Sequence, residues 1–325
     1  MGWLTFSELE AQADRVDALA ARTPSIDAFC SSSAWTFPAR RAFAPDAAPF
    51  IYDAGDCVVA LMVVESGSGA RVAVPLEAGW GLASPLLGPD PAQAVAVLRH
   101  MIAARPDGLS GIFLSGLHRH ADVWRGLVRA FARDCRLGLG PACPRRNASL
   151  EGGFDGFLGR RSSRFRANLR RAWRQARGAG VRFERATGEA DPAALYARIQ
   201  AVERQSWKGR AGEGIDHGSP RHFYDIMVHH LAARGALRAV FARRGDEDLA
   251  YVFGGVLADT YRGLQVSFAQ AHAEHSPGNL VQLAMIEWLC EEGVGWYDLG
   301  TDMPYKKRWA EEGLETHTLA LLPLE

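Results

Sequence analysis

The sequence predicts an α/β (α+β) fold built on a mixed, largely antiparallel sheet flanked by helices, and three observations support that prediction. Strand-like apolar runs joined by tight turns alternate with amphipathic stretches of helical period. The order strand pair, Ser-Pro loop, helix, strand, helix, strand occurs in each half. Apolar residues make up 48% of the 325 residues, enough for sizeable cores. Gly152, Gly153 and nearby prolines interrupt the pattern, so we expect two domains, residues 1–150 and 151–325.

Composition narrows the class of protein. Lys plus Arg equals Asp plus Glu at 37 each, so no overall field favours DNA or an anionic membrane. The five cysteines are scattered and lack CxxC spacing, which indicates reduced thiols in the cytoplasm and no metal site. No stretch reaches the roughly 18 apolar residues of a membrane span, and the N-terminus lacks a signal-peptide pattern. We therefore expect a cytoplasmic protein without a transmembrane segment.

The first half opens with a helical pattern over residues 4–23 and a Ser/Trp/Pro-rich stretch after it. Strand patterns at 57–66 and 70–77 flank a Gly/Ser turn, and a loop with Ser84 and Pro85 leads to a helix over 91–106. A strand at 111–117, a helix at 121–135 and an irregular strand to about residue 150 complete this half.

The second half begins with a basic helix at 160–180 and a strand at 181–187. Helices at 190–207 and 219–235 precede strands at 237–244, 249–259 and 264–271. Pro277 suits a first helical turn, so a helix is expected from there to a Gly stop. A short strand, a short helix at Pro304 and a last strand at 316–324 follow.

Five motifs of the second half carry a family resemblance: RSSRFRANLRRAWR, SWKG, SPGNLVQLAMIEW, GWYDLGTD and YKKRW. Together with the element order they resemble the GNAT N-acyltransferase fold. More narrowly, they are similar to the branch with the CelD/BcsL-type acyltransferases and the FemAB-like aminoacyl transferases. The resemblance covers about half of the chain. It implies two tandem GNAT-like domains, the first degenerate and the second catalytic.

The resemblance also implies a donor site at the helix that starts near Pro277. GNAT enzymes seat the pyrophosphate of acyl-CoA on an R/Q-x-x-G-x-G/A loop, and only the Gly278 position of that loop is kept here. A helix N-terminus after a strand favours phosphate in any case. We expect donor contacts from this turn and from the strand before it: His275, Ser276, Gly278, Asn279, Gln265 and Ser267.

Acyl transfer to an amine needs a base for the ammonium and a proton for the leaving group. Asp298, at the end of a short strand, is the first candidate for the base, with Glu203 and Glu287 behind it; alternatively, Asp298 caps the following turn or pairs with a lysine. In many GNAT enzymes a tyrosine in the following helix protonates the thiolate, a role that falls on Tyr305 here; alternatively, this ring packs in the core. By the same resemblance one of Lys306 and Lys307 lies near the donor, where it would clamp phosphate or stabilise negative charge, while the other is solvated; Lys306 is the first choice.

Two further segments are candidate binding surfaces. Residues 160–185 hold ten arginines and one glutamate around an apolar stripe, so Arg166 and Arg170 are expected to face phosphates unless the helix is simply solvated. Trp207 and Lys208 lie in a Gly-rich loop where GNAT folds shape the acceptor pocket, although the tryptophan could instead close the core.

The leading hypothesis is an N-acyltransferase that moves an acyl group from acyl-CoA, as co-substrate, to a small-molecule, lipid or sugar amine. The alternatives are a FemAB-like aminoacyl transferase that uses aminoacyl-tRNA, and a GNAT-like binding module without catalysis. No GxSxG, Walker or Rossmann motif occurs in a suitable context, so hydrolase, NTPase and dehydrogenase functions find no support.

Overall fold

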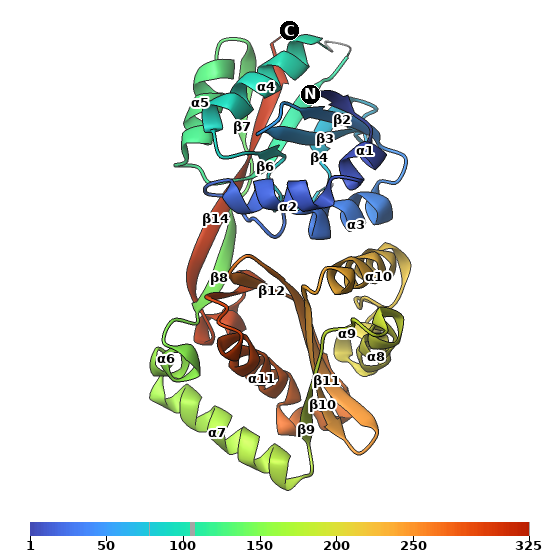
Figure 1. Ribbon diagram of the computed structural model, residues 1–325, viewed down its shortest axis with the longest axis vertical. Coiled ribbons are helices and arrows are strands. Elements are labelled where there is room, and N and C mark those ends of the chain that lie inside the picture. Colours follow the sequence, from blue (N-terminus) through green and yellow to red (C-terminus); the bar gives the residue numbers. More distant parts are fainter. Residues whose placement is uncertain (78, 105–107, 325) are drawn as a thin grey trace. The chain divides into compact units, whose positions relative to one another are not determined.

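The computed structural model describes residues 1–77, 79–104 and 108–324, apart from the side chain of His275. The chain divides into two compact units (Figure 1): Met1–Pro144 with the segment from Leu314 onward, and Arg145–Gly313. The expected boundary near residue 150 lies close to the first division. The second division differs from the expectation, because the last strand pairs within the first unit although it follows the second unit in the chain.

The first unit is a mixed sheet with helices on both faces. Its strands run in the order β1-β2-β3-β4-β6-β14, with β5 on β3 and β7 on β14. The strands are β1 (Gly2–Leu4), β2 (Ala48–Asp53), β3 (Val58–Glu65), β4 (Arg71–Pro75), β5 (Leu86–Leu87), β6 (Gly111–Leu117), β7 (Cys135–Leu139) and β14 (Glu311–Pro323). The helices are α1 (Phe6–Glu10), α2 (Ala13–Arg22), α3 (Ser33–Phe43), α4 (Pro91–Ala104) and α5 (Asp122–Phe131).

Alternation along β3 builds the two cores of this unit. Val58, Ala60 and Met62 pack with residues of α1 and α2, whereas Val59 and Leu61 pack with residues of α4 and α5. Successive side chains of a strand point to opposite faces, so a continuous apolar run predicts a strand buried on both sides.

The second unit holds the sheet β8-β13-β12-β11-β10-β9. Its strands are β8 (Cys143–Ser149), β9 (Arg182–Ala186), β10 (Leu237–Arg244), β11 (Glu247–Leu257), β12 (Thr260–Phe268) and β13 (Trp296–Thr301). Its helices are α6 (Gly153–Gly159), α7 (Ser163–Gly178), α8 (Pro192–Gln205), α9 (Trp207–Arg210), α10 (Gly218–Ala233), η1 (Gln270–His275), α11 (Pro277–Glu291) and η2 (Pro304–Arg308). All of these neighbours pair antiparallel except β12 with β13. The predicted mixed, largely antiparallel sheet flanked by helices is therefore confirmed.

Helix α11 covers one face of this sheet. It packs on β10 and β11, together with α6 and α7, and its residues from Leu280 to Leu289 form most of the helical side of the core. On the other face α8 packs on β11 and α10 packs on β10. The ring of Tyr224 in α10 also meets that of Phe253 in β11 edge to face. Figure 1 shows α11 and α7 on one side of the strands and α8, α9 and α10 on the other.

The parallel pair β12–β13 separates part-way along its length. Pairing runs from Thr260 with Trp296 to Arg262 with Asp298, while β12 continues to Phe268. At the point of separation a Cβ on Gly263 would lie 2.7 Å from the Tyr297 ring, so only glycine fits beneath that ring. The remaining length of β12 is left open on the side of β13.

Candidate functional site

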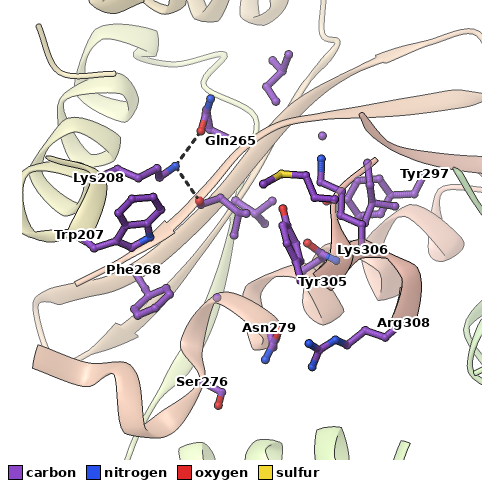
Figure 2. Close-up of a pocket in the computed structure, with 18 of the residues that line it drawn as sticks. Trp207, Lys208, Gln265, Phe268, Ser276, Asn279, Tyr297, Tyr305, Lys306 and Arg308 are labelled. Atoms are coloured by element: carbon purple, nitrogen blue, oxygen red, sulfur yellow. Dashed lines mark hydrogen bonds between the residues drawn. The ribbon is translucent and has the colours of Figure 1, made fainter. Parts of the chain in front are cut away.

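A cavity of about 740 Å³ occupies this opening in the second unit (Figure 2). Its walls come from the free end of β12, the start of α11, the end of β13, η2 and α9. Figure 2 shows Trp207, Lys208 and Phe268 on one side, with Tyr305, Lys306 and Arg308 opposite them. A ligand pocket of this size at the end of a parallel strand pair is a common place for small-molecule binding.

The start of α11 borders the cavity and has a backbone N–H group available to an anion. Ser276, in the left-handed region at φ 51°, precedes Pro277 at the first helical position and makes no side-chain cap. Asn279 and Leu280 donate their N–H groups to the Ser276 carbonyl, but the Gly278 N–H has no such partner among the described residues. A Cβ on Gly278 would lie 3.1 Å from Phe268, so glycine keeps this edge narrow. The helix dipole adds a partial positive charge at this point.

Lys306 is the most unusual ionisable group of the site. It is buried at 9% exposure, lines the cavity and donates from Nζ to the Thr301 carbonyl oxygen at 2.8 Å. Burial and the positive charge of Arg262 lower the pKa of Lys306 to about 8, against the opposing charge of Asp298. A buried ammonium with one protein partner has donors left for a ligand.

Lys208 faces the cavity from α9 and makes more contacts with the protein than Lys306 does. Its Nζ donates to Gln265 Oε1 at 3.0 Å and to the Val266 carbonyl at 3.2 Å, and lies 3.6 Å from Glu203. Glu203 is fully buried and accepts a hydrogen bond from Tyr251 at 2.8 Å. Burial lowers the pKa of Lys208. These bonds fix the position of α9 against β12.

The charge around the cavity is one-sided. Lys208, Lys306 and Arg308 line it, and no described carboxylate does. Tyr305 also lines it, with its ring 5.8 Å from Lys306 Nζ, and burial raises the pKa of its hydroxyl. The site therefore favours an anionic ligand, and Tyr305 offers it a neutral phenol as a proton donor.

Asp298, expected as the base, lies outside the lining of the cavity. Its carboxylate pairs with Arg262 at 2.5 Å and accepts the Gly300 N–H at 2.6 Å. Through these contacts Asp298 joins β13 to β12 and holds the turn between β13 and η2. The second candidates, Glu203 and Glu287, do not line the cavity either.

The other expected residues divide into two groups. The structure brings together at the cavity Gln265, Ser276, Gly278, Asn279, Trp207, Lys208, Tyr305 and Lys306. Ser267 is buried and does not line it, and the side chain of His275 lies outside the described residues. Arg166 donates to the Arg161 carbonyl at 2.8 Å beyond the end of α6, and Arg170 is exposed on α7; neither lines the cavity.

Sequence reasoning did not select Arg308, Met303 or Phe268, which also line the cavity. Arg308 stands in the YKKRW motif, so its position next to the two lysines was the available signal. Met303 and Phe268 carry no such signal, because an isolated apolar residue beside a strand is ordinary.

Helix α7 carries a face of arginines away from the core. Phe165, Leu169 and Ala176 are its buried residues. The exposed arginines without an ion pair among the described residues, here called the α7 arginine face, are Arg164, Arg170, Arg171, Arg174 and Arg177. Elsewhere in this unit arginines such as Arg161 and Arg198 pair with carboxylates. The α7 arginine face is therefore free to meet an external polyanion.

The described part of the chain shows neither a metal-binding cluster nor a membrane-spanning helix. No group of three His, Cys, Asp or Glu side chains there is arranged to hold a metal ion. None of the helices there has the length and apolar character needed to cross a membrane.

Known proteins resemble this chain in fold. Residues 163–307 match the family model described as "Acetyltransferase (GNAT) domain". A crystal structure of FemX is similar at 11% identity and a TM-score of 0.69, over 94% of this chain and 95% of that one. A conserved Bacteroides thetaiotaomicron protein of unknown function is similar at 12% identity and a TM-score of 0.61, over 96% and 97%.

A third solved structure is the C-terminal domain of a putative lysylphosphatidylglycerol synthetase from Agrobacterium fabrum. It shares 14% identity and a TM-score of 0.56, over 96% of this chain and 92% of that one. No curated protein matches the sequence significantly. At these identities the neighbours establish the fold alone, an α/β architecture shared along almost the whole chain. The matched model describes acetyltransferases, a class of transferase.

Proposed function

We propose that the second unit transfers an acyl group from an acyl thioester, with acyl-CoA as the donor, to an amine. The observation that carries this proposal is the cavity between β12 and β13, where Lys306, Arg308 and the start of α11 surround a space without a lining carboxylate. Such a space suits the phosphates of a carrier. The acceptor would be a small-molecule, sugar or lipid amine that enters the same cavity.

The proposed reaction uses two side chains directly. The neutral acceptor nitrogen attacks the thioester carbonyl, a C–N bond forms and the C–S bond breaks. The Lys306 ammonium stabilises the negative charge that develops on the carbonyl oxygen. Tyr305 gives its proton to the departing sulfur, because the reference pKa of a phenol, about 10, is close to that of a thiol, about 8.5. The proton lost by the nitrogen passes to water in the open cavity and returns to Tyr305.

The donor is tested by thermal unfolding and thiol release. Acyl-CoA at saturating concentration is expected to raise the unfolding midpoint, and an amine panel is expected to release free CoA. Tyr305→Phe is expected to lower kcat by about 10²-fold with little change in donor affinity. If no acyl-CoA raises the midpoint, the CoA-dependent proposal is wrong.

A second candidate, aminoacyl transfer from tRNA, is favoured by the α7 arginine face. Helix α7 packs against η1, which leads directly to the start of α11. The helix is roughly 24 Å long, a span better matched to an RNA backbone than to the few phosphates of CoA. The arginine face would then hold the donor RNA while its aminoacyl end reaches the cavity.

A matched pair of variants separates the two donors. Arg170→Gln with Arg174→Gln removes charge from the α7 arginine face, and Arg129→Gln with Arg133→Gln removes the same charge from exposed positions in the first unit. If tRNA is the donor, the first pair weakens tRNA binding and reduces its salt dependence, and the control pair does not. If CoA is the donor, neither pair changes acyl-CoA turnover by more than about twofold.

A further inference from the structure

Exposed apolar side chains of the second unit gather at the cavity. Among its described residues four large apolar side chains are exposed: Trp207 at 56%, Met303 at 47%, Trp296 at 42% and Tyr305 at 39%. All except Trp296 line the cavity. Apolar surface that is concentrated at one opening, rather than scattered, marks a place where a ligand covers it.

The apolar surface continues from the rim into the cavity. Leu264, Val266 and Phe268 line it from β12, and Leu299 lines it from β13. In Figure 2 Trp207 lies next to Phe268 on one side, and Tyr305 lies across from them. The cavity therefore has a cationic part, at Lys306 and Arg308, and apolar walls. These walls reach solvent at Trp207 and at Met303, here called the two rims.

We propose that the acyl group transferred by this site is long-chain or otherwise bulky and apolar, and that Trp207 and Met303 contact it. This inference rests on the proposed function. A donor whose anionic carrier lies at the cationic part places its acyl group along the same walls. An acetyl group is too small to cover two rims, whereas a chain of eight or more carbons removes both from water, and burial of apolar area is the main source of its affinity.

Trp207 can be replaced without a large risk to folding, because it is more than half exposed and begins a helix of four residues. The test measures the Kd of CoA, acetyl-CoA, octanoyl-CoA and dodecanoyl-CoA by calorimetry below their micellar concentrations. The proteins are the full chain, Trp207→Ala, Met303→Thr and the control Trp296→Ala, an exposed tryptophan of the same unit that does not line the cavity. Unfolding midpoints verify that each variant is folded.

The expected result is a Kd for dodecanoyl-CoA at least tenfold below that for acetyl-CoA. Trp207→Ala and Met303→Thr remove most of this preference and leave the acetyl-CoA value within about twofold, while Trp296→Ala behaves as the unmodified chain. Equal affinity for all four ligands, or a preference that both cavity variants keep, overturns the inference and leaves the proposed function standing.

Two other outcomes are distinct from these. If none of the CoA compounds binds, both the CoA dependence and the inference fail. A parallel series of butylamine, octylamine and dodecylamine locates the apolar group. If affinity follows the length of the amine and not that of the acyl chain, the apolar group belongs to the acceptor and the assignment to the acyl chain is wrong.

Discussion

The two units contain the same β-α-β arrangement, but they treat the space at the start of its helix in opposite ways. In the first unit β4 and β6 are parallel and α4 joins them, as α11 joins β12 and β13 in the second. The chain around Ser84 fills the junction of the first unit: a Cβ on Gly116 would lie 2.5 Å from the backbone of Ala83 and Ser84. The corresponding junction of the second unit is the cavity.

The two units also differ in the charged side chains near this junction. In the first unit Glu77 accepts the N–H groups of Leu82 and Ala83, and Asp90 accepts that of Ala92 at the start of α4. The first unit thus supplies its own carboxylates to free N–H groups, while cations line the cavity of the second. The candidate anion site therefore depends on the space that the chain leaves open beside β12 and not on the β-α-β arrangement, which both units share. We propose that the first unit is a degenerate partner and the second the catalytic domain.

The largest expected effect comes from the charge of the open site. Lys306→Met should lower acyl transfer by about 10²- to 10³-fold, because the cation that stabilises the developing oxyanion is lost. Lys307→Met is the matched control, since Lys307 is exposed and does not line the cavity. Steady-state kinetics on both variants measure the effect. Equal losses would mean that the cationic lining is not what distinguishes this junction.

The carboxylate of the filled junction should matter for stability alone. Glu77 is 1% exposed and accepts N–H groups from Leu82, Ala83 and Trp35, so Glu77→Gln turns an NH₂ group toward donors. We expect a loss of about 2 kcal/mol in the free energy of unfolding, measured in denaturant, with donor Kd unchanged. Glu65→Gln, at an exposed position, should change neither. A shift in donor Kd for Glu77→Gln would link the two junctions functionally.

A carboxylate introduced at the start of α11 should give the second unit what the first unit has, a carboxylate of the chain itself beside free N–H groups. Ser276 precedes α11 in the left-handed region, which Asp and Asn adopt more readily than other residues. Ser276→Asp should stabilise the fold by about 0.3–1 kcal/mol through the helix dipole and weaken donor binding roughly tenfold. Ser276→Asn keeps the shape without the charge and should bind the donor nearly as well. The opposite order of the two affinities would show that the start of α11 does not meet an anion.

The sequence predicted the local part of this comparison well. Proline at the first turn predicted α11 from Pro277, and the observed helix runs to Glu291. Apolar alternation predicted β10, β11 and β12 within a few residues. These elements depend on near neighbours in the chain, which periodicity and turn residues report. The helix α3 was missed, because Pro38 within it resembles a break and only burial of residues such as Trp35 and Phe37 compensates.

Contacts between distant residues could not be predicted. Asp298 was expected to act as a base because it ends a strand, but its partner Arg262 is 36 positions away on the neighbouring strand. Arg166 belongs to a predicted arginine face, yet its guanidinium binds carbonyls near the end of α6. A partner on another strand fixes Asp298, and carbonyls five to eight positions earlier fix Arg166; the periodicity of the sequence reveals neither contact.

The smallest expected effect is a pH dependence of donor binding that only the open junction should have. Its source is Lys306, whose pKa burial and Arg262 lower to about 8; Arg145 acts in the same direction, and Asp298 and Asp302 oppose them. Donor affinity should fall by roughly fourfold from pH 7 to pH 8.5, as the ammonium loses its proton. Lys306→Arg should give a flat profile in a titration by calorimetry. A slope that persists in Lys306→Arg would assign it to another group.

The free energy of unfolding should change with pH in the opposite direction to donor affinity. A second measurement therefore tests the same titration of Lys306. The pKa of Lys306 is lower in the folded chain than in the unfolded one, where lysine titrates near 10.4. The unfolded state therefore binds more protons between about pH 8 and pH 10.4, and the free energy of unfolding rises with pH across that window. Below pH 8 the cost of the buried charge is fully present. In Lys306→Met the free energy of unfolding should no longer rise with pH, and donor binding should be lost as well. Both follow because a buried cation that serves a ligand destabilises the fold when the ligand is absent.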